Sequence, residues 1–319
     1  IVPAFLLGGL GAAFGMIVFN HKTSKIKFRI LVPLAFIVNI AFLIAVYMYF
    51  KTFQINDHIY QFKDPLGVLC TLIIGKEKAM LIDTCYGIGD LPSLIKNYTN
   101  LPLVVIASHG HMDHTGGNYQ FEEVYINELD LELCKQYNSY EWRKSELANA
   151  INANVLPTNF DEKLFLSKRA GNLKVIKNYT TIDLGNINCE IIPMEGHTQG
   201  SIGIYIKEEN ILVVTDATCP FVWMFLPEST TVQTYIDMLN RTLKLPFKYI
   251  LLGHGAGTLV PRKRVLEFLN VASTINMKIA KKVTFNNFEK YNSYCYTLGK
   301  MYDQNDCGIV FDPNKLYNK

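Results

Sequence analysis

The stretch Ser108-His109-Gly110-His111-Met112-Asp113-His114-Thr115-Gly116-Gly117 places three imidazoles and one carboxylate within six residues. It directly follows the apolar run Leu103 to Ala107, which is too short and too β-branched for a helix and therefore predicts a buried strand. The glycine pair that closes the stretch lets the backbone turn away without steric cost. The sequence thus predicts that a group of ligand-type side chains begins where a buried strand ends.

The spacing of these side chains favours metal binding over a place in the hydrophobic core. In extended chain His109 and His111 point to the same side, whereas on a helix they would diverge by roughly 200°. The pair therefore suits a strand end or a loop, from which Asp113 and His114 can turn toward a second point. Imidazole and carboxylate suit zinc and related divalent ions. An isolated histidine is more often an ordinary core or surface residue, but three in this pattern indicate a site for two metal ions.

The rest of the chain supplies further ligand-type residues at the ends of apolar runs. Five of the seven histidines occupy glycine-flanked positions of this kind, and only His21 and His58 fall outside. His197 lies in Glu195-Gly196-His197-Thr198, and His254 lies in Leu252-Gly253-His254-Gly255. The segment Val213-Val214-Thr215-Asp216-Ala217 again puts a carboxylate at the end of a strand-like run.

In chain order these residues resemble the metallo-β-lactamase superfamily, in its glyoxalase II and lactonase-like branch, over about residues 53–280. The matching series is Asp83, His109-x-His111-x-Asp113-His114, His197, Asp216 and His254. The resemblance implies that the first metal is held by His109, His111 and His197, that the second is held by Asp113, His114 and His254, and that Asp216 bridges both. Asp83 would orient the ligand loop without touching metal. Thr215 departs from the family, which usually has glycine before the bridging aspartate.

The strand and helix signals fit the fold that this resemblance implies. Short strand-like runs separated by turn residues occupy about residues 59–82 and 173–214. Helices are predicted over 90–97 and 128–150, from Thr230 to about Leu243, and from Pro261 to about Lys281, with a surface insertion over 152–171. Propensity alone gives only an α/β chain. The resemblance implies an αββα four-layer sandwich with its ligands on loops along one sheet edge.

The first 51 residues predict a two-helix transmembrane hairpin, followed by the metal-binding domain over 52–319. Residues 1–20 and 30–50 carry no charge, and at about 1.5 Å per residue each run reaches roughly 30 Å, the thickness of the hydrocarbon core. The loop from His21 to Arg29 holds four basic residues and no acidic one. By the positive-inside rule this loop is cytoplasmic, so the catalytic domain is expected on the extracytoplasmic side.

Charge and cysteine content bear on partners and compartment. Residues 1–51 hold five of the 31 basic residues and no acidic one, which leaves 26 basic against 28 acidic residues and a net charge of −2 for the remainder. This balance gives no electrostatic signal for nucleic acid, so a small-molecule substrate is expected. The seven scattered cysteines argue against a disulfide framework. This speaks against an extracytoplasmic domain, because disulfides are common in oxidising compartments. We give the loop charge more weight. The oligomeric state is not indicated.

Two divalent metal ions, zinc first with manganese or iron as alternatives, would make the chain a hydrolase without a serine or cysteine nucleophile. Such ions lower the pKa of a bridging water from about 15.7 toward about 7 and polarise an acyl oxygen. Asp113 would bind metal and orient this water or move its proton. Esters, thioesters and lactones are the favoured substrates.

Three other functions are weighed against this one. A phosphodiesterase on the same fold would need a basic groove, and a flavodiiron-type redox enzyme would need a flavin domain. The sequence shows a signal for neither. A non-catalytic, membrane-tethered sensor has no reason to keep every ligand. Asp216 disfavours a true β-lactamase. The aromatic residues after Asp216, including Trp223, either line an acyl pocket or pack in the core, and for Trp142 packing is favoured over a place at the site.

Overall fold

The computed structural model describes Leu34 and residues 49–317 except 159, 302 and 304. The chain divides into two units after Phe50, and the sheets belong to the second unit. The predicted transmembrane hairpin of residues 1–51 lies almost entirely outside the described residues. Within the part of the chain that the structure describes, no helix combines the length and the apolar character needed to cross a membrane.

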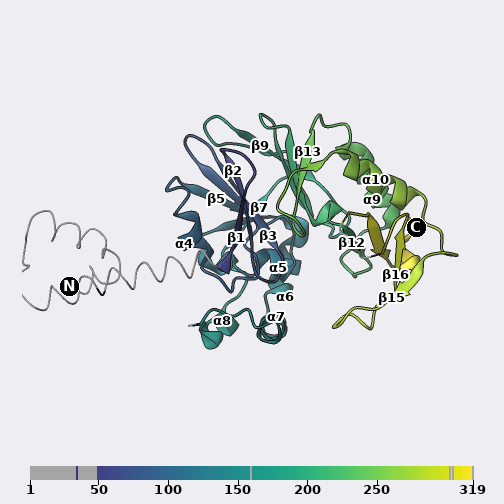
Figure 1. The fold of residues 1–319 in the computed structure, drawn as a ribbon, viewed down its shortest axis with the longest axis horizontal. Coiled ribbons are helices and arrows are strands. Elements are labelled where there is room, and N and C mark those ends of the chain that lie inside the picture. The colour runs from purple at the N-terminus through teal and green to yellow at the C-terminus, as the bar shows by residue number, and fades with distance from the viewer. Residues whose placement is uncertain (1–33, 35–48, 159, 302, 304, 318–319) are drawn as a thin grey trace, which may run out of the picture. The chain divides into compact units, whose positions relative to one another are not determined.

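The first sheet contains seven strands that follow one another in chain order (Figure 1). Neighbours are antiparallel up to the fourth strand and parallel from there on. Apart from the two outer strands, most of their residues are buried, as the apolar runs predict. The strands are β1 (Lys51–Gln54), β2 (Ile59–Lys63), β3 (Leu69–Ile74), β4 (Ala79–Ile82), β5 (Leu103–Ile106), β6 (Val124–Asn127) and β7 (Leu173–Ile176).

The second sheet contains six strands in the order β14-β13-β11-β10-β9-β8. Only β11 and β13 pair in parallel. Every residue of β10 and β11 is buried, because both faces of this sheet are covered. The strands are β8 (Thr181–Asp183), β9 (Asn188–Pro193), β10 (Ile202–Ile206), β11 (Ile211–Thr215), β13 (Tyr249–Leu252) and β14 (Val260–Pro261).

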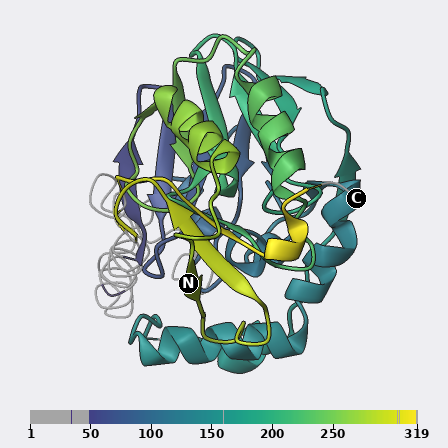
Figure 2. The same ribbon diagram turned by 90° about the vertical axis from the view of Figure 1, so that its right-hand side faces the viewer.

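Two hydrophobic cores hold the layers together. Between the sheets, Ile73 and Ile82 of the first pack in one cluster with Ile191 and Ile204 of the second. On the other face of the second sheet, Leu212 and the helices α9 (Val232–Thr242) and α10 (Lys263–Ser273) share another cluster. Figure 2 shows these two helices side by side in front of the second sheet. Helix α4 (Leu91–Ile95) lies on the first-sheet side in Figure 1, so the layers follow the predicted αββα order.

The predicted helix over 128–150 is helical but broken into three pieces. These are η2 (Glu128–Asp130), α6 (Leu131–Tyr137) and α7 (Tyr140–Asn152). The break falls where the Ser139 side chain caps α7 by accepting a hydrogen bond from the amide of Trp142. Most described residues of the surface insertion predicted over 152–171 are exposed or half-buried, and it contains a short helix that was not predicted, α8 (Glu162–Ser167), capped by Asp161.

The last helix was predicted too long, and a third sheet was not predicted at all. Helix α10 ends at Ser273, and residues near the predicted end form β15 (Lys281–Val283) instead. This strand forms one edge of a four-stranded sheet in the order β12-β17-β16-β15. The other strands are β12 (Phe221–Met224), β16 (Ser293–Thr297) and β17 (Gly308–Phe311). The last strands of the chain therefore form one sheet with β12, which lies in the segment that follows Asp216.

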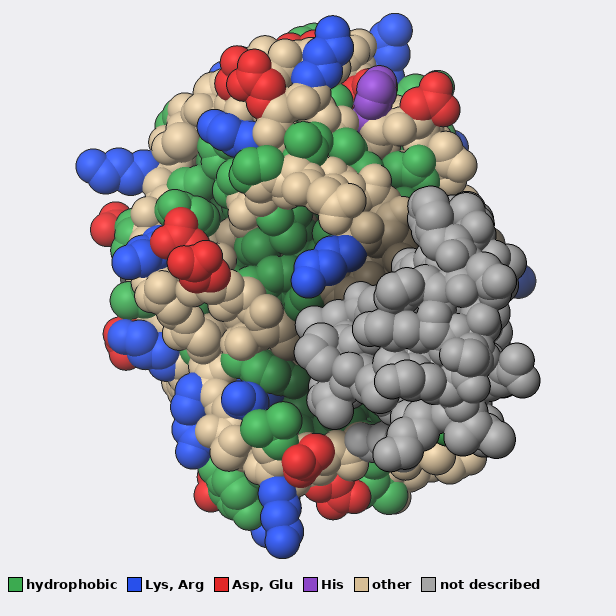
Figure 3. Space-filling view, turned by 90° about the vertical axis from the view of Figure 1, so that its left-hand side faces the viewer, with side chains coloured by type: hydrophobic (Ala, Val, Ile, Leu, Met, Phe, Trp, Pro, Cys, Tyr) green, Lys and Arg blue, Asp and Glu red, His purple; other side chains and the backbone are tan. Residues whose placement is uncertain are grey.

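The surface drawn in Figure 3 carries mixed charge over the described residues. Lysine and arginine side chains alternate with aspartate and glutamate side chains, and hydrophobic side chains line a hollow near the middle of this face (Figure 3).

Candidate metal centre

The predicted ligands lie on loops that follow strands pointing in one direction. Asp83 follows β4 and His109 follows β5, and these strands are parallel neighbours in the first sheet. In the second sheet His197, Asp216 and His254 follow β9, β11 and β13, of which β11 and β13 are parallel and β9 runs the same way through antiparallel β10. The facing sheets thus bring all the ligand loops to one edge. The remaining loop folds into two short helices, α5 (Met112–Thr115) and η1 (Asn118–Gln120).

Three histidines form the first cluster. His109, His111 and His197 are buried and each offers one ring nitrogen to a common point. The Nδ1 atom of His111 lies 2.9 Å from the Nε2 atom of His197. The Nε2 atom of His109 is buried and has no hydrogen-bond partner. Three ring nitrogens that meet at one point, and that do not all carry a hydrogen, suit a cation.

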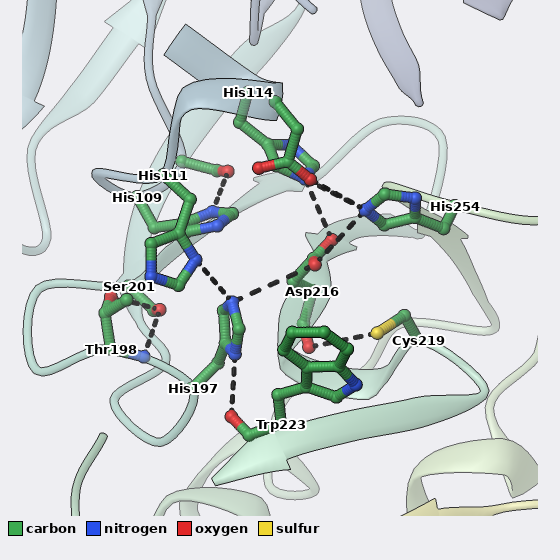
Figure 4. A network of polar contacts seen from close by, with 12 residues as sticks. His109, His111, His114, His197, Thr198, Ser201, Asp216, Cys219, Trp223 and His254 are labelled. Carbon is green, nitrogen blue, oxygen red and sulfur yellow. Dashed lines mark hydrogen bonds and ion pairs between the residues drawn. The ribbon is translucent and has the colours of Figure 1, made fainter. Parts of the chain in front are cut away.

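Four side chains form the second cluster (Figure 4). The Nε2 atom of His114 lies 3.2 Å from Asp216 Oδ1 and 3.4 Å from Asp113 Oδ2. The Nε2 atom of His254 lies 3.3 Å from Asp113 Oδ2 and 3.4 Å from Asp216 Oδ2. Asp216 Oδ2 also lies 3.9 Å from His197 Nε2 of the first cluster. Asp216 therefore stands between the two clusters, where a bridging ligand would have to be.

Hydrogen bonds behind the clusters fix which ring nitrogen carries a proton. Asp83 Oδ2 accepts from His114 Nδ1 at 2.7 Å and from the Ser108 hydroxyl at 2.9 Å. Because that hydroxyl donates to Asp83, its oxygen accepts from His109 Nδ1 at 3.0 Å. His109 Nε2 is thereby left as an acceptor directed into the site, and His114 Nε2 is the ring nitrogen that faces Asp113 and Asp216.

Two further imidazoles are fixed in the same way. His197 Nδ1 donates to the carbonyl of Trp223 at 2.7 Å, and His111 Nε2 donates to Glu228 Oε1 at 2.9 Å. The nitrogens that face each other across 2.9 Å are therefore both acceptors and repel unless a cation lies with them. The three imidazoles of the first cluster and the two imidazoles and two carboxylates of the second converge here, so the residues present fit two divalent metal ions.

The two clusters differ in protonation. Burial holds the pKa of His109 well below its usual range and that of His197 at about 4, so both are neutral at pH 7. In the second cluster burial opposes ionisation of Asp113 and Asp216, but His114 and His254 outweigh it and hold the pKa of both carboxyls well below the usual range. Against the effect of burial, the same carboxylates raise the pKa of His114 well above its usual range and that of His254 to about 10. A metal ion bound at the second cluster would therefore take the place of protons on these two rings.

A cavity of about 590 Å³ opens beside both clusters. The ligand side of the cavity contains His111, Asp113, His197, Asp216 and His254. Much of the remaining wall is aromatic or aliphatic, and among the described residues that line it none is lysine or arginine. The apolar wall is formed mainly by Met112, Tyr137, Trp142, Phe221, Trp223, Leu226 and Phe288. Both Trp142 and Trp223 thus reach the site, although for Trp142 packing was the favoured prediction.

Comparison with known proteins fits this geometry. The model of the metallo-beta-lactamase superfamily matches residues 64–254, more than half of the chain. The chain belongs to this superfamily. Among curated relatives, the acyl-coenzyme A thioesterase MBLAC2 of Bos taurus is 25% identical over 206 residues, which are 60% of this chain and 72% of the relative. The same protein of Homo sapiens is 24% identical over 206 residues, with the same coverage. This superfamily member is therefore a metal-dependent hydrolase.

Solved structures show the fold of this superfamily member. The stereoselective inverting sec-alkylsulfatase Pisa1 from Pseudomonas sp. matches with a TM-score of 0.55 at 16% sequence identity. The match covers 73% of this chain but only 43% of the sulfatase. At this identity the likeness supports the shared fold and carries no information on substrate.

All eight residues predicted from the sequence lie at this one centre. Seven form the two clusters, divided as the family resemblance implies, except that Asp216 is grouped with the second cluster and also approaches the first. Asp83 lies behind them and bonds the ligand loop through the Ser108 amide and hydroxyl. That the seven residues bind metal stays a prediction.

Thr215 shows the local geometry for which superfamily members usually have glycine. Its φ is +43°, a region that a β-branched residue seldom adopts. The strain lies directly before Asp216, and such strain typically costs about 1–3 kcal/mol. Gly253 lies opposite, and a Cβ atom there would come within 2.5 Å of Asp216 Oδ1. The backbone is thus tightly fitted around the bridging carboxylate.

Two acidic residues that sequence reasoning missed hold the ligand loops in this superfamily member. Asp130 accepts from the amide of Gly110 at 2.8 Å, from the amide of Gly200 at 2.8 Å and from the hydroxyl of Thr198 at 2.6 Å, so it ties the loops of His109 and His197 together. Glu228 accepts from His111, and His111 holds the pKa of the Glu228 carboxyl at about 2 against the effect of burial. Neither residue lies in a motif, so the sequence offered no signal for them.

Proposed function

We propose that the chain is a membrane-anchored dinuclear zinc hydrolase of acyl thioesters, within the glyoxalase II and lactonase-like branch of its superfamily. One observation carries the proposal: two ligand clusters open onto an apolar pocket whose described lining holds no lysine or arginine. A phosphate-bearing substrate would gain from arginine or lysine side chains beside the metal ions, whereas an acyl group gains from an apolar wall. The acyl-coenzyme A thioesterases among the curated relatives support the same substrate class. Esters and lactones share this acyl chemistry and complete the proposed range.

The proposed ligands follow the two clusters. His109, His111 and His197 would hold one ion, Asp113, His114 and His254 the other, and Asp216 would contact both. Zinc is proposed first because the donor set is imidazole and carboxylate without thiolate, which manganese and iron also accept. When bound, two such ions lower the pKa of a water they share and polarise the acyl oxygen.

Asp113 is the proposed catalytic residue. Its side chain is the most open of the carboxylates in the clusters, with 22% exposure against 10% for Asp216, and it lines the pocket. The low pKa of the Asp113 carboxyl keeps it ionised, so it can orient the attacking water by accepting its hydrogen bond. The aromatic wall excludes bulk water from the acyl group.

A substrate panel tests the hydrolase proposal. Wild type and Asp113→Asn would be assayed on thioesters, lactones, aryl esters, phosphodiesters and β-lactams, with and without added metal. We expect metal-dependent cleavage of thioesters by wild type and a large loss in the variant. Cleavage confined to phosphodiesters would favour the phosphodiesterase alternative. No metal-dependent cleavage of any substrate would favour the sensor alternative.

We also propose that residues 1–51 anchor the chain in a membrane with the catalytic domain on the extracytoplasmic side. The uncharged runs and the basic loop between them support this proposal. Reporter fusions after Arg29 and after Phe62 should report opposite sides of the membrane. If both report the cytoplasm, the orientation is wrong and the free cysteines gave the better indication.

A further inference from the structure

The outer wall of the pocket is built by two segments far apart in the chain. Helix α7 contributes Trp142, and the loop between β15 and β16 contributes Phe288. The rings of these two residues lie 6.1 Å apart. The Asn287 side chain also reaches Ser145 of α7 at 3.5 Å. The loop lies beyond residues 64–254, the part that the superfamily model matches, whereas Trp142 lies within it.

The facing wall is Trp223, which is fixed to the metal centre. Its backbone carbonyl accepts the hydrogen bond from His197 Nδ1, and its indole lines the same pocket. The Phe288 ring lies 5.4 Å from the Trp223 ring. Phe288 therefore contacts both tryptophans and closes the pocket between them. A chain that leaves the ligand clusters along this wall contacts these three rings.

The third sheet holds Phe288 in place. Phe285 stacks on Phe225 at 5.5 Å and lies 4.5 Å from Trp223, in a cluster with Val283, Cys295 and Val310. Phe285 belongs to this supporting cluster and not to the pocket wall, whereas Phe288 belongs to both. The two phenylalanines thus form a matched pair for experiment, one structural and one exposed to the pocket.

We propose that Phe288, with Trp142 and Trp223, forms the acyl-chain site and sets the chain length that the enzyme accepts. This inference rests on the proposed thioesterase function and names its specificity-determining residue. The occupant is an unbranched hydrocarbon chain, because the wall is aromatic and no cation lines it among the described residues. Burial of one methylene is worth about a fourfold change in affinity. Affinity should therefore rise with the length of the acyl chain until the pocket is full.

The test is a series of straight-chain acyl-CoA thioesters of increasing length, measured on the full chain. Wild-type kcat/KM should rise about fourfold for each methylene and then level off. Phe288→Ala should lower kcat/KM for the best wild-type substrate by about tenfold and move the optimum to longer chains. Phe288→Trp should move the optimum to shorter chains. Phe285→Ala, whose side chain does not line the pocket, should reduce thermal stability and move the optimum less than Phe288→Ala does.

Intrinsic fluorescence separates this inference from the proposed function. The chain has two tryptophans, and both line the pocket. Straight-chain alkyl amides should change the emission of wild type and bind about tenfold more weakly to Phe288→Ala than to Phe285→Ala. Amide binding without hydrolysis of any thioester would support the chain site and overturn the hydrolase. Thioester hydrolysis with one and the same optimum in wild type, Phe288→Ala and Phe288→Trp, or no emission change with any amide, would overturn the chain site.

Discussion

Glu228 accepts a hydrogen bond from His111 at 2.9 Å, and the same oxygen accepts one from Tyr137 at 2.5 Å. The carboxylate therefore fixes the His111 ring with Nδ1 toward the first cluster. Glu228→Ala should weaken metal binding by about 10–100-fold, the usual effect of removing a residue that orients a ligand. Competition with a chromophoric chelator measures this affinity.

Glu228→Gln is the matched control, because its amide oxygen can accept both hydrogen bonds. Its metal affinity should stay close to wild type. Equal affinities of Glu228→Ala and wild type would show that His111 needs no support from this residue.

Asp113→Asn should leave the fold intact, weaken the second metal and lower kcat by about 10²–10⁴. The reason is that the amide holds no negative charge with which to accept a proton from the attacking water. Steady-state kinetics on a thioester, together with the metal content of the variant, measures both effects. Wild-type kcat in fully loaded Asp113→Asn would refute the role of this carboxylate.

Gly253→Ala should displace the second cluster. The added Cβ atom would lie 2.5 Å from Asp216 Oδ1 and 2.8 Å from His114 Cε1, closer than atoms can pack. His109, His111 and His197 lie outside the loops of Gly253 and Asp216, so we expect the variant to bind one ion where wild type binds two. Mass spectrometry under native conditions counts the ions. Two ions in Gly253→Ala, bound as tightly as in wild type, would contradict this account of the site.

Asp64 predicts a pH dependence of stability that is independent of catalysis. Burial raises the pKa of its carboxyl to about 6, although the amides of Gly67 and Val68 donate to Oδ1. Its contribution to stability is full below its ordinary pKa of 3.8 and is lost as the pH rises through about 6. Asp64→Asn keeps the acceptor without the charge. Above this range it should therefore be more stable than wild type by about 3 kcal/mol.

Urea unfolding of chelator-treated wild type and Asp64→Asn at a series of pH values measures this difference. The stability difference between the two proteins should grow between pH values of about 4 and about 6 and then stay constant. A constant difference over the whole range would show that the Asp64 carboxyl does not titrate abnormally.

The parts of this molecule that the sequence predicted are those encoded locally. Leu103 to Ala107 predicted β5 because a buried strand reads as an apolar run, and it ends within one residue of the prediction. The ligand loop was recognisable because four predicted ligands fall within six residues. Thr230 was predicted to cap a helix, and the cap is Thr231, one residue later. Local rules thus located elements and erred mainly at their ends.

What the sequence could not predict depends on contacts between distant residues. Glu228 meets His111 across 117 positions, and a single glutamate after a proline carries no signal for this. The strands of the third sheet are short, and β12 pairs in parallel with β17 at the far end of the chain. Phe288 lies at the pocket because of this third sheet, which no local sequence pattern predicted.

The central claim is that two metal ions bound at this centre drive hydrolysis of an acyl thioester. The most direct measurement is the thioesterase rate of the full chain as a function of metal content, determined by elemental analysis during stepwise removal and return of zinc. We expect negligible activity in the metal-free protein and full activity at two ions per chain. Full activity in metal-free protein, or an inactive protein that carries two ions, would contradict the account.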